Sequence, residues 1–347
     1  MPLQQLLGID LPLIQAPMAG VQNHALAAAV SNAGGLGSLP GALLDAAGLR
    51  AELTALTAKT AKPYNLNFFC HTPAQADARR EAAWREALAP YYAELGLDPT
   101  SISAGPGRQP FSAEMAEVLE EFRPPLVSFH FGLPSAELLA RVKACGAKVL
   151  SSATTVEEAL WLEEHGVDAL IAQGLEAGGH RGHFLDPDIN RQLGTFALLP
   201  QIVDAVRLPV IAAGGIADAR GIRAAMALGA AGVQIGTAYL CCPEASTSAV
   251  HRAALQSPQA RHTALTNLFS GRPARGIVNR LMRELGPISP GAPGFPLATA
   301  AIAPLRAKAE GQGSGDFSPL WAGQNVSGCK NIGAAELTAE LAQGFAP

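Results

Sequence analysis

Residues 208–237 read LPVIAAGGIADARGIRAAMALGAAGVQIGT, and this stretch contains the unit on which the fold depends. Two short apolar runs, LPVIAAGG (208–215) and GVQIGT (232–237), flank the helical pattern DARGIRAAMALG. The apolar residues in each run are continuous and do not alternate with polar ones, which predicts strands buried on both faces of a parallel sheet. A strand, a helix and a second parallel strand therefore follow one another here.

The same unit repeats along the whole chain. Apolar runs at 11–17, 36–40, 64–69, 126–131, 148–153 and 168–174 precede these two, and helical patterns such as SAELLARVKACG and TVEEALWLEEHG separate them. Eight parallel strands with helical crossovers predict an α/β fold, a (β/α)₈ TIM barrel. A doubly wound open sheet is the alternative.

Two stretches do not fit the repeat. Residues 72–125 form a long insertion after the third strand, and residues 243–347 extend beyond the eighth. The Pro/Gly-rich GPISPGAPGFP within the extension is expected to be a loop. We expect a barrel domain over 1–242, including insertion 72–125, and a C-terminal extension over 243–347 that contributes to a substrate-side cap. The insertion follows a strand, so it emerges on the catalytic face.

Composition and charge exclude several classes of function. The chain has 347 residues and a formal charge of −4 with no basic stripe, which argues against a nucleic-acid partner. The uncharged stretch 224–242 is interrupted by glycines and reads as a helix end, a turn and a strand, not as a membrane span. Five cysteines without metal-like spacing and a start without a secretion signal predict reduced thiols in the cytoplasm.

Glycines at the last two strand ends indicate a phosphate site. Gly214 and Gly215 follow the seventh strand, and Gly236 and Thr237 follow the eighth. Barrels of this kind bind phosphate there with backbone N–H groups and a helix N-terminus. A simple strand-to-helix turn is the alternative for either loop taken singly.

Two amides and a histidine lie at other strand ends. Asn67 and Gln173 each offer donors and an acceptor for the edge of a flat heterocycle, so with a phosphate site they favour a phosphorylated aromatic cofactor such as FMN. The segment AQGLEAGGHRGHF (172–184) adds His180 behind a cluster of glycines that would let the loop pass against that cofactor. His183 follows at i+3, but no third ligand has sensible spacing, so we expect no metal.

The sequence resembles the nitronate monooxygenase family, formerly called 2-nitropropane dioxygenases, and most of all its bacterial class I members. The similarity covers nearly the whole chain, and AQGLEAGGHRG is its most specific segment. The other matching segments are PLIQAPMAG, SNAGGLGSL, NLNFFCH, SFHFGLP, PVIAAGGIADARG, GVQIGTAYL, FSGRPARGI and LWAGQ.

The resemblance implies a TIM barrel with non-covalent FMN and His180 as the catalytic residue. The family's flavin contacts fall on Asn67, Gln173, Gly178, Gly215, Gln234, Ile235, Gly236 and Thr237. Tyrosines help line the substrate cavity in related class I enzymes, but GFPLATAAIAPLRAK (294–308) has none and offers Phe295 and Lys308 instead. We therefore expect His130 and Lys308 in the substrate pocket.

The function that the resemblance implies is FMN-dependent oxidation of alkyl nitronates, of which propionate 3-nitronate is one. O₂ would be consumed, and a carbonyl compound and nitrite released. One alternative on the same barrel is an NAD(P)H-dependent flavin reductase of quinones or enoyl thioesters. Another is a flavin-binding barrel without catalysis. The expected partners are small molecules only, and the sequence leaves a monomer and a homodimer open.

Overall fold

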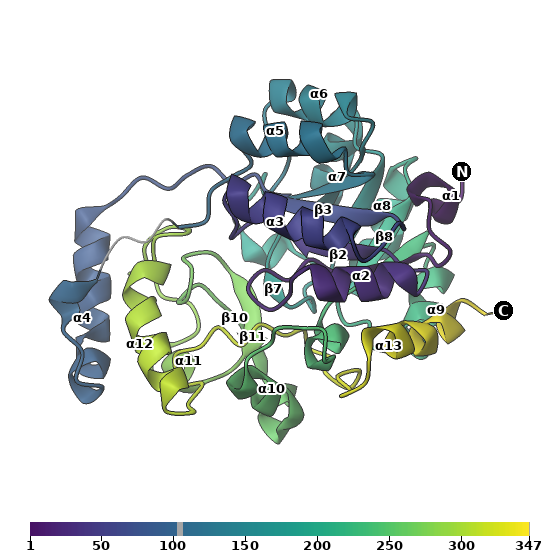
Figure 1. Ribbon diagram of the computed structural model, residues 1–347. Helices are drawn as coiled ribbons and strands as arrows, with labels where there is room; N and C mark the ends of the chain where they lie inside the picture. The colour runs from purple at the N-terminus through teal and green to yellow at the C-terminus, as the bar shows by residue number, and fades with distance from the viewer. Residues whose placement is uncertain (103–106, 347) are drawn as a thin grey trace.

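A barrel of eight parallel strands forms the centre of the molecule, as the sequence predicted (Figure 1). The computed structural model describes residues 1–102 and 107–346. The strands pair in the order β1-β9-β8-β6-β5-β4-β3-β2, and a parallel bridge between Ile14 and Leu36 joins the two ends of that order. The barrel strands are β1 (Leu13–Gln15), β2 (Gly37–Pro40), β3 (Tyr64–Phe69), β4 (Leu126–His130), β5 (Lys148–Ala153), β6 (Ala169–Gln173), β8 (Val210–Ala213) and β9 (Gly232–Ile235).

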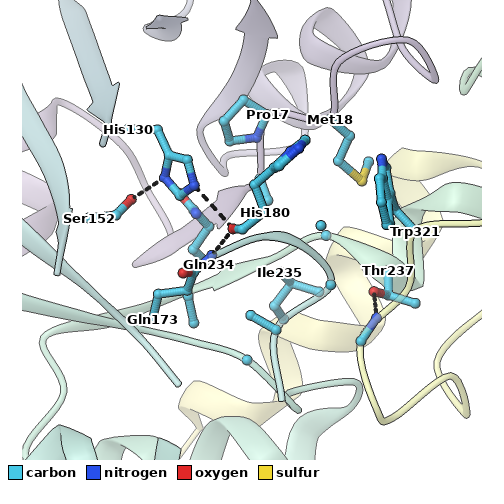
Figure 2. A pocket seen from close by; sticks show the side chains of 18 of the residues that line it. Pro17, Met18, His130, Ser152, Gln173, His180, Gln234, Ile235, Thr237 and Trp321 are labelled. Carbon is cyan, nitrogen blue, oxygen red and sulfur yellow. Dashed lines mark hydrogen bonds between the residues drawn. The ribbon is translucent and has the colours of Figure 1, made fainter. Parts of the chain in front are cut away.

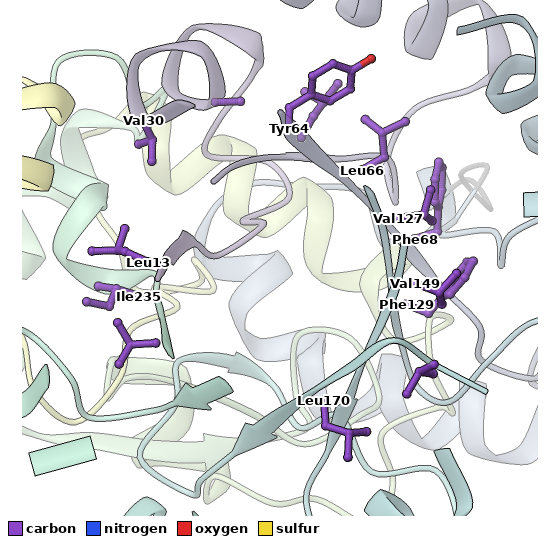
Figure 3. Packing of buried hydrophobic residues seen from close by; sticks show 14 of the residues in the cluster. Leu13, Val30, Tyr64, Leu66, Phe68, Val127, Phe129, Val149, Leu170 and Ile235 are labelled. Atoms are coloured by element: carbon purple, nitrogen blue, oxygen red, sulfur yellow. The ribbon is translucent and has the colours of Figure 1, made fainter. Parts of the chain in front are cut away.

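The strands are largely apolar because both of their faces are buried. Successive side chains of a strand point to opposite faces of the sheet. Leu66, Val127 and Leu170 pack outward against the helices (Figure 3), whereas Leu126 and Ile171 belong to a separate cluster inside the barrel. Helix α1 (Leu3–Leu7) contributes Leu3 and Leu7 to that inner cluster.

Seven helices follow the strands in the expected alternation and cover the outside of the barrel. Side chains at the N-caps, such as Asp45, Thr155 and Asp218, accept backbone N–H groups of the first turn and thereby fix where helices begin. These helices are α2 (His24–Asn32), α3 (Ala46–Thr57), α5 (Ala113–Phe122), α6 (Ala136–Ala144), α7 (Val156–Glu164), α8 (Thr195–Ala205) and α9 (Ala219–Ala227).

The position of α5 shortens the insertion that we expected over 72–125. Helix α5 packs between α3 and α6, which is the place of the barrel helix that connects β3 with β4. Its residues Val118 and Leu119 are buried in the same core as the barrel strands. The extra material therefore ends before α5, and α4 (Ala78–Glu94) is its main element.

The eighth barrel helix comes from the far end of the chain. Helix α13 (Ala334–Ala342) packs against α2 and α9, and Leu337 and Leu341 join the barrel core. The Tyr239 hydroxyl lies 2.9 Å from Thr338 Oγ1, which ties α13 to the segment after β9. The expected division at residue 242 thus needs correction, because the chain leaves the barrel after β9, builds a cap, and returns to complete the ring.

The cap combines the insertion with residues 243–332. Helices α4 and α12 (Thr299–Gly311) lie side by side away from the barrel (Figure 1) and share a core that contains Trp84, Tyr92 and Leu305. A three-stranded antiparallel sheet, which the sequence analysis missed, links the cap to the barrel through β7. The remaining cap and connecting elements are β7 (Gly179–His180), β10 (Thr263–Thr266), β11 (Ala274–Ile277), α10 (Ala249–Gln256), α11 (Arg280–Leu285), η1 (Pro99–Ser101), η2 (Ile189–Arg191), η3 (Thr237–Cys241), η4 (Pro258–Arg261) and η5 (Gln343–Phe345).

Two further expectations concern apolar and irregular segments. The stretch GPISPGAPGFP (286–296) forms neither helix nor strand, as predicted. The uncharged stretch 224–242 contains the end of α9, a turn and strand β9, as predicted, and then the 3₁₀-helix η3, which was not predicted. In the described part of the chain, no helix combines the length and the apolar character that crossing a membrane requires.

If α13 is a barrel helix, removing one of its core side chains should destabilise the whole barrel. Leu337→Ala is expected to lower the free energy of unfolding by about 2–5 kcal/mol, the usual cost of a buried Leu-to-Ala change. Leu160→Ala, on the exposed side of α7, serves as the control and should change it by less than about 0.5 kcal/mol. Urea unfolding followed by far-UV circular dichroism measures both, and equal small effects would contradict this role of α13.

Candidate active site

One large pocket opens at the carboxyl ends of the barrel strands (Figure 2). It encloses about 1350 Å³, including its mouth, between strand-end loops and the cap. Ten of the eleven residues singled out in the sequence line it: Asn67, His130, Gln173, Gly178, His180, Gly215, Gln234, Ile235, Gly236 and Thr237. Lys308 does not, because it lies exposed on α12, so the expectation that it borders the substrate pocket was wrong.

The loops after β8 and β9 present free backbone N–H groups to the pocket. Gly214 and Gly215 have φ angles of 118° and 74°, which non-glycine residues rarely adopt. Within the described residues, no acceptor is bonded to the backbone N–H of Gly215, Gly236 or Thr237. Thr237 begins the 3₁₀-helix η3, so its N–H is one of the unpaired donors at a helix start. The arrangement suits a phosphate group.

Gln234 carries a buried acceptor that has no partner. Its side-chain Oε1 is inaccessible to solvent and makes no hydrogen bond to any described residue, although the side chain lines the pocket. A buried polar atom without a partner costs roughly 1–3 kcal/mol. A planar ring with an N–H donor at its edge would remove that cost, and the isoalloxazine ring of a flavin is such a group. The residues at this end of the pocket therefore fit FMN.

Residues 321–325 of the cap cross the glycine-containing loops that follow β8 and β9. Gly323 N donates to Thr237 Oγ1 at 2.9 Å, and Asn325 Nδ2 donates to Gly215 O at 3.1 Å. A Cβ atom on Gly178 would lie 2.5 Å from Gly323 N, so this glycine is required by the crossing chain. The crossing chain is a structural requirement for this glycine in addition to the cofactor contact expected from the sequence. We call residues 321–325 the strap; it overlaps the segment LWAGQ (320–324), one of those that carry the family resemblance.

The backbone of His180 is held from two sides. His130 Nε2 donates to the His180 carbonyl at 3.1 Å, and Gln173 Nε2 donates to the same oxygen at 3.0 Å (Figure 2). Gln173 Oε1 accepts from Gly182 N at 2.8 Å. Because a carbonyl only accepts, His130 carries its proton on Nε2, and Ser152 Oγ, 3.0 Å away, donates to Nδ1. His130 and Gln173 thus position the loop that presents His180.

The His180 ring is neutral and sits among aromatic side chains. Its centroid lies 5.2 Å from that of Phe295 and 5.6 Å from that of Trp321. Burial holds the pKa of His180 well below its usual value of 6.5, and the positive charge of Arg108 lowers it further. The imidazole is therefore an unprotonated base at neutral pH.

The hydrogen bond between His180 Nε2 and Ser270 Oγ determines which ring nitrogen of His180 is basic. His180 Nε2 lies 2.9 Å from Ser270 Oγ, and that hydroxyl lies 3.4 Å from Arg272 O, a group that only accepts. The hydroxyl proton is thus directed to the carbonyl, and Nε2–H donates to Ser270. Nδ1 then keeps its lone pair, and it makes no hydrogen bond within the described residues.

Two arginines, the fully buried Arg181 and the partly buried Arg272, place positive charge near His130. Arg181 is fully buried and donates to Gly174 O at 2.6 Å and Gln173 O at 2.7 Å, and burial lowers its pKa to about 9. The Arg272 guanidinium lies 4.1 Å from the centroid of the Phe131 ring. Neither forms an ion pair with a carboxylate of the described residues. Neither arginine carried a recognisable signal in the sequence, and the same holds for the pocket residues Arg108 and Trp321.

His183 was considered as a metal ligand in the sequence because it follows His180 at i+3. His183 is buried, and its Nδ1 has no hydrogen-bond partner there. No group of three or more His, Cys, Asp or Glu side chains comes together in residues 1–102 and 107–346 in a way that could hold a metal ion.

The barrel, its strand-end pocket and the neutral histidine define an enzyme of the TIM-barrel type. The family model described as nitronate monooxygenase matches residues 1–344, and the chain belongs to that family.

Known proteins support the assignment over nearly the full length. A nitronate monooxygenase from Paraburkholderia phytofirmans is 48% identical and covers 97% of this chain and 92% of its own. A nitronate monooxygenase from Pseudomonas aeruginosa is 46% identical, and the match covers 98% of this chain and 97% of that protein. The solved nitroalkane oxidase of Streptomyces ansochromogenes aligns with a TM-score of 0.89 at 38% identity, covering 99% of this chain and 98% of that one.

Buried neutral histidines should make the fold sensitive to mild acid. Burial lowers the pKa of His130 and His183 to about 3 and that of His251 to about 4, against about 6.5 in the unfolded chain. Below pH 6.5 the unfolded state binds protons that the folded state does not, so stability falls as pH falls from about 6.5 toward 4. Each histidine contributes up to about 1.4 kcal/mol per pH unit.

Urea midpoints at pH 7.5 and 5.5 measure this dependence. The midpoint should be clearly lower at pH 5.5, and His183→Asn, which removes one titrating group, should make the difference smaller. Equal midpoints at the two pH values would show that these histidines take up no protons on unfolding.

Proposed function

We propose that the protein binds FMN and oxidises alkyl nitronates with O₂ to a carbonyl compound and nitrite. The observation that carries the proposal is the neutral His180 in a pocket bordered by the guanidinium of Arg108. A nitronate is the anion of a nitroalkane, so a positive pocket attracts it. A neutral base can also form it from the parent nitroalkane.

FMN would occupy the end of the pocket that the glycine loops and Gln234 form. The phosphate would accept the N–H groups of Gly215, Gly236 and Thr237, and Gln234 Oε1 would accept a ring N–H. When bound, FMN would supply the electron-transfer chemistry between the nitronate and O₂. The proposed contacts also include Asn67, Gln173, Gly178 and Ile235, which line the same pocket.

Asn67 and Gln173 differ in which atoms of the side-chain amide are available to form a hydrogen bond with a cofactor. Asn67 Nδ2 donates to Ser128 Oγ at 2.9 Å, while its Oδ1 has no partner in the described residues and can accept. Both polar atoms of Gln173 already bond to the loop that carries His180. Gln173 would thus contact FMN mainly through its second N–H, and Asn67 through its oxygen.

The chain's own contribution to the reaction is to bind, to orient and to hold a proton. His180 Nδ1 would take the α-proton of a neutral nitroalkane, since Nε2 is engaged with Ser270. The aromatic rings of Phe69, Phe295 and Trp321 limit the access of water to the imidazole. A preformed nitronate needs no base and uses only the binding groups.

The cofactor and its phosphate contact can be tested together. Denaturing the purified protein should release a flavin that mass spectrometry identifies as FMN, because the pocket has one cradle suited to a phosphate. A Cβ on Gly236 would lie 3.2 Å from Ala16 Cβ, a tight but adjustable contact, so Gly236→Val should fold yet retain much less FMN. Full FMN content in the folded variant would show that this turn does not approach the phosphate.

His180→Asn separates proton removal from oxidation. Its turnover of neutral nitroalkanes should fall by roughly 10²–10⁴-fold, as expected when a general base is lost. Its turnover of the corresponding nitronates should fall much less, because the proton is already gone. Oxygen consumption at matched flavin content measures both forms. Equal losses on both would assign His180 to holding the anion or the flavin.

A further inference from the structure

Two cysteines meet where the chain leaves the strap. Cys241 is the last residue of η3, the 3₁₀-helix that begins at Thr237, and Cys329 follows shortly after the strap. Both pack in one apolar cluster, in which Cys241 is fully buried and Cys329 is partly exposed. Both are free thiols, so a small reagent can approach the pair from the side of Cys329.

The segment after the strap packs tightly on η3. A Cβ atom on Gly328 would collide with Ala217 O and lie 3.0 Å from Ala238 Cβ, so the backbone approaches η3 as closely as glycine allows. Next to it, Cys329 Sγ donates to Thr237 O at 3.1 Å. The Cys329 thiol is therefore held against η3 by its own backbone.

The single proton of the Cys329 thiol has two acceptors within reach. One is Thr237 O, and the other is the Cys241 sulfur. Donation from Cys329 lowers the pKa of Cys241 to about 7, and the positive charge of Arg252 acts in the same direction against the effect of burial. The same hydrogen bond raises the pKa of Cys329. The contact thus joins a sulfur that readily forms a thiolate to a second thiol.

The other three cysteines lack this arrangement. Cys242 packs in the barrel core, not with Cys329, and burial raises its pKa to about 12. Burial also raises the pKa of Cys70 and of Cys145, which lies at the end of α6. Cys241 is the one cysteine of the chain whose pKa lies below the usual value of 9.0.

The pair adjoins the part of the chain that covers the glycine loops. Gly323 N donates to Thr237 Oγ1 and Asn325 Nδ2 donates to Gly215 O, so the strap rests on both loops whose N–H groups suit a phosphate. These two contacts are hydrogen bonds that can open. A covalent bond just beyond the strap would join its end to η3, which begins at the same Thr237.

We propose that Cys241 and Cys329 are a hydroperoxide-sensitive dithiol, and that their disulfide ties the end of the strap to η3 and retains FMN in the pocket. The retention of FMN rests on the proposed function. A phosphate under the strap could leave only after residues 321–325 separate from the glycine loops, and the disulfide opposes that separation.

The oxidation balances with a hydroperoxide as the oxidant. The Cys241 thiolate attacks one oxygen, the O–O bond breaks, and a sulfenic acid forms on Cys241. Cys329 then attacks that sulfur, the S–O bond breaks, and the S–S bond forms. With hydrogen peroxide, two thiols lose two electrons and two protons, and two water molecules leave. A small thiol reverses the reaction, as expected of a transient disulfide in a reducing compartment.

Peptide mapping tests the chemistry. The flavin-loaded protein is treated with hydrogen peroxide, the remaining thiols are alkylated, and the digest is analysed by mass spectrometry without reduction. A peptide that joins Cys241 to Cys329 should appear and should vanish on treatment with dithiothreitol. Cys241→Ala and Cys329→Ser should abolish it. The controls Cys242→Ala and Cys145→Ser, which remove a neighbouring thiol and another partly exposed thiol, should retain it.

The rate of FMN release tests the consequence. Reduced and peroxide-treated samples are diluted into flavin-free buffer, and the fluorescence of released flavin is followed. Release should be roughly tenfold slower after peroxide treatment of the wild-type protein, because opening of the strap is a local unfolding that the disulfide opposes. In Cys329→Ser the two rates should be equal. Urea midpoints and initial flavin content establish that each variant is folded and loaded.

The outcomes separate this inference from the proposed function. A Cys241–Cys329 link together with slower release supports it. The absence of the link, or a link that leaves the release rate unchanged, would overturn it without affecting FMN binding or nitronate oxidation. A protein that takes up no FMN would contradict the proposed function, and the retaining role of the disulfide would fail with it.

Discussion

The carbonyl oxygen of His180 is the point on which the arrangement of the site depends. It accepts two hydrogen bonds, one from His130 at the end of β4 and one from Gln173 at the end of β6. Two strands of the rigid barrel thereby fix the backbone of a loop that also pairs, as β7, with the cap strand β11. Removing either donor would leave the loop held from one side, and the imidazole would lose its defined place beside the pocket.

Burial gives the same loop its chemical character. The aromatic rings around His180 exclude water and lower its pKa, and the nearby arginines lower it further. A histidine on a solvated loop would be partly protonated at neutral pH and a poor base. The cap is therefore as necessary as the barrel, because it supplies Phe295, Trp321 and the strap that crosses the glycine loops.

Much of the barrel could be predicted from the sequence because its signal is local. Continuous apolar runs mark strands buried on both faces, and all eight predicted strands are present. Strand ends converge at one mouth in any such barrel, so residues as distant as Asn67 and Gly236 could be placed together without coordinates. The cap resisted prediction because its small sheet has strands of two to four residues, too short to show a period.

The remaining errors have specific physical causes. Helix α13 was assigned to the extension because sequence order does not reveal that a chain can return to complete a ring. Lys308 was expected in the pocket from its place near Phe295 in the sequence, but α12 turns it toward solvent. Arg108 gave no signal, since a single arginine in an irregular segment can be placed at the pocket only once the fold is known.

The most direct test of the central claim is an anaerobic titration of the flavin-loaded protein. A nitronate and NADH are added to separate samples without O₂, and the visible flavin spectrum is followed. We expect the nitronate to bleach the spectrum rapidly and NADH to leave it unchanged. Rapid bleaching by NADH with no response to the nitronate would contradict it and identify a nicotinamide-dependent reductase on the same barrel.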